Sequence, residues 1–154
     1  MKKFINILFI IMLFVSFPKI SYASTPPDII QTDTEDFGNG FYGITTLEIQ
    51  SDNTRTVKTA SKTYTLKTSS GTTAASFKLT ATFNYPSGSS ALCTYVSHST
   101  SISDTKWKFS KKSSAKSGNT ASGTFTANLV SSGITLESIS KTITLTCDKY
   151  GNIT

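Results

Sequence analysis

The sequence is poor in the residue types that carry most enzyme chemistry. Its 154 residues include one histidine, two cysteines and one tryptophan, and only 16% of them are charged. A histidine-based metal site needs more ligands than the single ring of His98 provides. No glycine-rich phosphate-binding loop stands between a candidate strand and a candidate helix. We therefore expect no cofactor, no metal and no enzyme activity.

Helical patterning is also lacking. No window carries a helical stripe of apolar residues, and good helix formers are few. The length suits one domain, which excludes a multidomain enzyme, a coiled coil and a polytopic membrane protein. The chain is unusually rich in hydroxyl groups, because serine and threonine together supply 50 residues. Its aromatic residues, 11% of the chain, are sufficient for a real core.

Residues 1–23 have the features of a secretory signal peptide. Lys2 and Lys3 precede an apolar run over residues 4–17, and Ser21 and Ala23 are the small residues of a cleavage site. As a helix the run would rise only about 21 Å, against roughly 30 Å for a hydrocarbon core, which disfavours an uncleaved anchor. We expect a secreted, extracellular protein that begins at Ser24 and has no transmembrane segment.

Cleavage would change the charge balance. Three lysines leave with the signal peptide, so the net charge falls from +6 to +3. A charge this small does not predict nucleic-acid binding. Residues 24–40 then hold two prolines, two glycines and four acids, and we expect them to form a disordered acidic linker. The alternative is an acidic arm that docks on the basic remainder of the chain.

Residues 41–154 carry the alternation of a β domain. Phe77, Leu79 and Phe83 alternate with polar residues, and Phe125, Ile143 and Leu145 do the same further on. Turn signals separate about seven strands, which we place at 43–50, 55–67, 74–85, 90–98, 105–112, 119–129 and 138–147. This pattern predicts a single antiparallel β-sandwich, with a small β-barrel as the alternative.

Particular residues follow from that pattern. We expect a core that contains Phe77, Leu79, Phe83, Trp107, Phe125, Ile143 and Leu145. Gly123 stands inside a strand and is a candidate β-bulge.

The two cysteines predict a structural disulfide. Cys93 and Cys147 lie in expected strands of an exported chain, and with two cysteines only one intramolecular pair exists. A redox or nucleophilic pair is the alternative, but neither cysteine has an activating base beside it in the sequence. The order Cys93, Trp107, Cys147 is similar to that of immunoglobulin domains, in which a tryptophan packs on the disulfide. Leu145 replaces the tyrosine of a tyrosine corner, so we expect immunoglobulin-like architecture in general only, with Trp107 packed near the disulfide.

A second resemblance covers roughly residues 62–154. It is carried by the run 77–85, by Ala91 to Thr94, by Trp107 to Ser110, by Ser114 to Asn119, and by Leu145 to Cys147 followed by Gly151. These segments resemble a group of small, secreted, Ser/Thr-rich, disulfide-containing β proteins of Gram-positive bacteria with no assigned activity. The resemblance implies secretion and a disulfide, and it implies no catalytic residue.

A basic segment is the most suggestive surface. Two aromatic residues, Trp107 and Phe109, alternate there with the first of five lysines, which are Lys106, Lys108, Lys111, Lys112 and Lys116. The lysines are either a solvated face that protects an edge strand or a patch for an anionic polymer, a membrane surface or nucleic acid.

We expect a non-enzymatic binding or structural module at the cell exterior. Its partner would be an anionic cell-envelope polymer or another exported protein. The sequence does not specify its oligomeric state. The alternatives are a secreted hydrolase that uses surface carboxylates and a bacteriocin-like effector.

Overall fold

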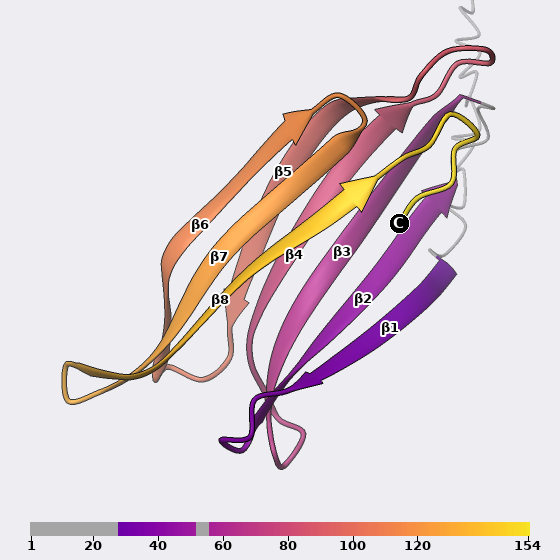
Figure 1. The fold of residues 1–154 in the computed structure, drawn as a ribbon. Coiled ribbons are helices and arrows are strands. Elements are labelled where there is room, and N and C mark those ends of the chain that lie inside the picture. The colour runs from indigo at the N-terminus through magenta and orange to yellow at the C-terminus, as the bar shows by residue number, and fades with distance from the viewer. Residues whose placement is uncertain (1–27, 52–55) are drawn as a thin grey trace, which may run out of the picture.

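The computed structural model describes residues 28–51 and 56–154 (Figure 1). The expected signal peptide, residues 24–27 and the segment 52–55 lie outside the described residues. Eight strands follow one another along the chain: β1 (Asp28–Asp36), β2 (Phe41–Ser51), β3 (Val57–Thr68), β4 (Thr73–Asn84), β5 (Leu92–Ile102), β6 (Trp107–Ser117), β7 (Thr120–Ser131) and β8 (Ile134–Thr146).

The strands form two antiparallel sheets. One sheet has five strands in the order β1-β2-β3-β4-β5, and the other has three in the order β6-β7-β8. Every hydrogen-bonded neighbour is also a sequence neighbour, and the chain passes from one sheet to the other once, between β5 and β6. Within the described ranges the sheets stay separate (Figure 1), so the predicted β-sandwich is confirmed and the barrel alternative is wrong.

The core lies between the two sheets. The small sheet packs on β3, β4 and β5, whereas β1 and β2 extend beyond it (Figure 1). All seven core residues predicted from the alternation are buried, and Phe77, Leu79, Phe83 and Leu145 are fully inaccessible. On the solvent faces, hydroxyl pairs link neighbouring strands: Thr59 and Thr82 lie 3.0 Å apart, as do Ser61 and Thr80. The excess of serine and threonine therefore covers the outer surfaces of the sandwich.

The acidic segment differs from the expectation of a disordered linker. Asp28–Asp36 forms β1, an edge strand that pairs antiparallel with β2. Glu35 forms an ion pair with Lys141 of β8 at 2.5 Å, and the Lys141 ammonium lies 5.7 Å from the centre of the Phe37 ring. The alternative of an acidic arm docked on the basic remainder of the chain agrees better with the structure, because β1 pairs with β2 and Glu35 meets Lys141. The arm does not reach the lysine-rich strand β6. β1 borders β2 at one edge of the large sheet, whereas β6 lies beside β5 at the opposite edge.

Gly123 is not a bulge. It pairs in register with Ser114 and Ile143, and the shifts in β7 pairing fall elsewhere. Its role is steric, because a Cβ at this position would lie 2.7 Å from Cε1 of Phe77 and 3.1 Å from Cδ1 of Leu79. The glycine therefore lets the large sheet pack directly on the backbone of β7.

Candidate functional site

The basic strand β6 is an outer strand of the small sheet. Its inner row begins with Trp107, which is 1% exposed, and continues with Phe109, which packs on the core. Lys108 pairs with Asn128 of β7, and Asn128 pairs with Ser138 of β8, so these three residues form one row across the sheet. Because residues that pair across a sheet project to the same side, Lys108 faces away from the core.

A bulge at Ser110 decides where the other lysines point. The pairing shifts between Phe109 and Lys111, so Lys111 pairs with the outward residue Thr126, and Lys112 pairs with the buried Phe125. Without the shift, Lys111 would stand in the inner row. The sequence pattern contains no signal for this extra residue, and simple alternation gives the wrong face for both Lys111 and Lys112.

Lys106 extends the outer row by one position. The Val130 amide donates to the Lys106 carbonyl at 2.7 Å, which continues the β6–β7 ladder before the first residue of β6. Lys106 therefore points outward, because the next residue, Trp107, points inward. The Lys106 amide donates to Asp104 Oδ1 at 3.0 Å. Lys106, Lys108 and Lys111 share the outer face of the small sheet, which we call the lysine face.

The lysine face has no acidic neighbour within β6, β7 and β8. Glu137 is the one acid in these strands. It pairs with Leu129 in the inner row, and its Oε2 accepts a hydrogen bond from Asn39 Nδ2 at 3.2 Å. The rest of the outer face is neutral and polar, as in the hydrogen bond from the Ser138 hydroxyl to the Asn128 side chain at 2.9 Å. In the described part of the chain the ion pairs are Lys78–Glu48 and Lys141–Glu35, so none of them involves a lysine of the lysine face. The nearest acid is Asp104, whose carboxylate accepts the Lys106 amide just before β6.

The two remaining lysines turn toward β5. Lys112 and Lys116 belong to the inner row of β6, although both are exposed at this outer strand. The Lys116 ammonium donates to the Thr94 carbonyl of β5. The predicted five-lysine patch is thus divided between two directions, with three lysines outward and two along the seam between β5 and β6.

The single histidine lies in the same seam. His98 Nδ1 and Ser114 Oγ are 2.9 Å apart, and the imidazole stacks on Phe77 with ring centroids 5.5 Å apart. This contact joins β5 of one sheet to β6 of the other. A catalytic triad would also require an acid that orients the ring, and no carboxylate hydrogen-bonds to His98 in the described residues. The pair is consistent with a polar bridge between the sheets.

Outside the acidic strand β1, the surface carboxylates of the described residues do not converge. Glu48 pairs with Lys78 on the large sheet, and Glu137 binds Asn39. Asp104 receives the Lys106 amide, and Asp52 lies outside the described residues. Asp148 is engaged by its own turn: its Oδ1 accepts the Tyr150 and Asn152 amides, and its Oδ2 accepts Asn152 Nδ2 at 2.7 Å.

These hydrogen bonds from Asn152 lower the pKa of the Asp148 carboxyl. Asp148 therefore stays charged and closes the turn. It does not act as a proton donor.

A shallow hollow of about 390 Å³ opens beside the β1–β2 turn. Asp36 is the one carboxylate that lines it, and its Oδ1 accepts the Gly38 amide at 2.9 Å. A glycosidase mechanism needs two carboxyl groups that flank one bond. This hollow supplies only one, which its own turn already engages.

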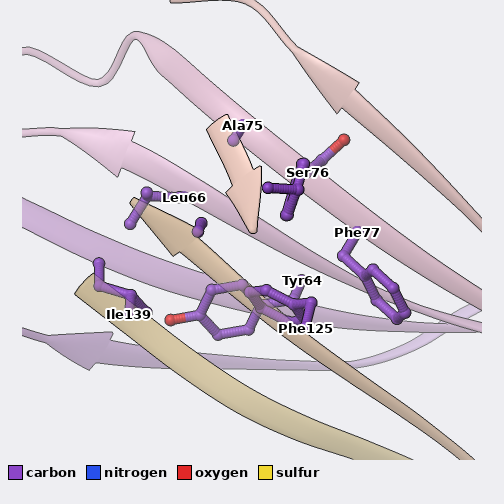
Figure 2. A pocket seen from close by; sticks show the side chains of 9 residues that line it. Tyr64, Leu66, Ala75, Ser76, Phe77, Phe125 and Ile139 are labelled. Carbon is purple, nitrogen blue, oxygen red and sulfur yellow. The ribbon is translucent and has the colours of Figure 1, made fainter. Parts of the chain in front are cut away.

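The interior gives no alternative site. Figure 2 shows the region between the sheets around Tyr64, Phe77 and Phe125, where the rings pack too closely to admit a water molecule. The Tyr64 hydroxyl has no hydrogen-bond partner, and burial raises its pKa far above the ordinary value, with the nearby Glu35 charge adding to the shift. Gly43 provides the space for this hydroxyl, because a Cβ there would lie 2.0 Å from it.

The expected disulfide between Cys93 and Cys147 is absent, and both residues are buried free thiols. The Cys93 amide donates to the Gly118 carbonyl, whereas the Cys147 amide donates to the Asn119 carbonyl. The turn between β6 and β7 therefore lies between the two cysteines. Each sulfur instead approaches a carbonyl oxygen of its own segment, that of Tyr95 at 3.3 Å and that of Asp148 at 3.4 Å.

The expected packing of Trp107 near the cysteines is also wrong. Trp107 pairs with Leu129 at one end of β7, whereas Thr146, which precedes Cys147, pairs with Thr120 at the other end. Nine residues of strand span about 30 Å. Trp107 packs instead against the edge of Phe41, with ring centroids 5.3 Å apart.

The described residues contain no helix that could span a membrane. They also contain no group of three or more His, Cys, Asp or Glu side chains placed to hold a metal ion. No protein-family model, curated protein or solved structure matches this chain.

Proposed function

We propose that the protein is a secreted, non-enzymatic binding module of the cell exterior, and that its lysine face binds an anionic polymer of the cell envelope. The observation that carries the proposal is the alignment of Lys106, Lys108 and Lys111 on one exposed face, to which β6, β7 and β8 contribute no acid. Successive outward residues of a strand stand about 6.6 Å apart, so several ammonium groups can contact neighbouring phosphates of one extended polyanion.

Secretion rests on the signal-like residues 1–23 and on the resemblance to exported β proteins. The hydrolase alternative stays a prediction. Glu48, Asp104, Glu137 and Asp148 lie on different elements, and each hydrogen-bonds or ion-pairs within its own neighbourhood, which favours the binding module. A bacteriocin-like effector likewise stays an untested alternative. Another exported protein as partner would use the same exposed charges.

Binding to long-chain polyphosphate tests the proposal directly. The probe presents repeated phosphate charges without apolar groups, and neutral dextran is the control ligand. We expect the protein to bind polyphosphate and not dextran. Affinity should fall steeply with added salt, because exposed charges are screened over about 8 Å at physiological ionic strength.

The bulge at Ser110 supplies a matched pair of variants. Lys108→Gln with Lys111→Gln removes two charges from the lysine face, and Lys112→Gln with Lys116→Gln removes two charges from the seam on the same strand. We expect the first variant to lose about tenfold or more in affinity and the second to lose clearly less. Equal losses in both would show that only net charge matters. An unchanged affinity in the first variant would exclude the lysine face as the site.

A further inference from the structure

The tip of the β7–β8 hairpin carries two exposed aliphatic side chains. Ile134 is 66% exposed and Leu136 is 62% exposed. The turn itself consists of Ser132 and Gly133, which have φ values of 51° and 81°. Positive φ at both central residues is typical of a two-residue hairpin turn. The turn is therefore tight, and the hairpin reaches past the neighbouring loop of the small sheet (Figure 1).

This tip adjoins the lysine face. Val130 pairs with Thr135, and its amide donates to the Lys106 carbonyl. Ile134 and Leu136 flank Thr135 in the chain, so both aliphatic residues lie two strands from Lys106 at the same end of the sheet. Residues 128–136 contain no acid. The pairing shifts between Leu129 and Val130, which leaves Leu136 as an extra residue beside Val130 on the side of the lysine face. Ile134 pairs with Ser131 and points to the other side of the tip. Leu136 and the lysines thus lie on one side at this end of the sheet, and Ile134 completes the apolar tip.

Binding to a soluble polyanion does not explain the exposed aliphatic side chains Ile134 and Leu136. Ile134 and Leu136 would stay in water beside such a polymer. An anionic bilayer stabilises both halves, because its phosphates attract the lysines and its acyl boundary accepts the aliphatic groups. The β7–β8 tip is short and charge-free, which suits shallow insertion at the level of the headgroups.

We infer that the protein binds the surface of an anionic lipid bilayer, with Ile134 and Leu136 inserted and Lys106 and Lys108 against the lipid phosphates. The inference rests on the proposed function, since it uses the same lysine face and adds an anionic bilayer to the polymer that this face binds. The partner class is a phospholipid surface with net negative charge. Binding is peripheral and reversible, as two small apolar groups and a few charges are a weak anchor.

Vesicle co-sedimentation with the full secreted chain tests this assignment. One vesicle contains equimolar phosphatidylglycerol and phosphatidylcholine, and the other contains phosphatidylcholine alone. We expect binding to the anionic vesicle, weakened by salt, and little binding to the neutral one. Polyphosphate binding is measured in parallel, so that failure of the inference and failure of the proposed function give different results.

The decisive variant is Ile134→Ser with Leu136→Ser. We expect about tenfold or more weaker binding to anionic vesicles and unchanged binding to polyphosphate. Leu92→Ser with Tyr95→Ser removes two equally exposed apolar side chains from β5 and should leave vesicle binding unchanged. Equal melting temperatures establish that all variants are folded.

Four results would overturn the inference. Wild-type protein that binds polyphosphate but not anionic vesicles would exclude the bilayer and leave the proposed function in place. Vesicle binding unaffected by the Ile134 and Leu136 substitutions would exclude insertion of the tip. Self-association of the wild type that these substitutions abolish would assign the tip to a second copy of the chain. Absence of binding to either probe would overturn both the inference and the proposed function.

Discussion

Replacement of Gly123 by alanine tests whether the stability of β7 at this position depends on the local strand preference or on the packing between the two sheets. Considered alone, Gly123→Ala should stabilise the protein, because glycine in a strand costs roughly 0.5–1 kcal/mol relative to alanine. The structure predicts the opposite sign. The added Cβ would lie 2.7 Å from Cε1 of Phe77, closer than such atoms approach in real proteins.

The Phe77 ring has little room to move away. It stacks on Phe125 at 4.9 Å on one side and on His98 at 5.5 Å on another, and it is fully buried. The sheets must therefore separate slightly, or a ring must leave its preferred rotamer. Overpacking of this kind typically costs about 1–3 kcal/mol. We expect Gly123→Ala to lower the free energy of unfolding by an amount in that range.

Urea unfolding followed by Trp107 fluorescence measures this change, since Trp107 is buried in the core. Ser122→Ala is the matched control, because Ser122 neighbours Gly123 on β7 but faces outward and should change stability by less than about 0.5 kcal/mol. In the Gly123→Ala background, Phe77→Leu should cost less than it does alone, because the smaller side chain relieves the overlap. Wild-type or higher stability for Gly123→Ala would refute the packing argument.

Two further predictions concern the interior. Phe125→Ala should cost about 3–5 kcal/mol, because Phe125 is 2% exposed and packs on the rings of Tyr64, Phe77 and Phe109; a loss below about 1 kcal/mol in the same urea assay would contradict its inward placement. Burial raises the pKa values of the Cys93 and Cys147 thiols above their ordinary 9.0, and the pKa of Tyr64 is raised as well. The folded state therefore holds these protons more tightly than the unfolded state, so the contribution of these three groups to stability should be constant well below pH 9, and stability should decline as the pH rises through and above 9. Both thiols should react slowly with a thiol reagent until the protein unfolds, and a mass two hydrogens short would show instead that they are joined.

The sequence by itself determined the strands and the direction of most core side chains. Alternation of apolar and hydroxyl residues is a local property, and it places Phe77, Leu79 and Phe83 inward wherever the strand lies in the fold. All seven expected strands are present. Branched threonines suit the solvent-facing side of a strand and aromatic residues suit its buried side, and both preferences can be read from the strand's own sequence.

Tertiary structure alone decided four other features. β1 forms because an acidic segment pairs with β2 and because Glu35 meets Lys141, which is 106 residues away. Gly123 is needed because of Phe77 on the opposite sheet. Lys111 joins Lys106 and Lys108 on the lysine face because a single bulged residue, Ser110, shifts the alternation of β6. The environment of the two free thiols is set by the β6–β7 turn, because the amides of both cysteines bond to its adjacent residues Gly118 and Asn119. Each of these features depends on which segments meet across the sandwich, and the pattern along one strand carries no information about its partner.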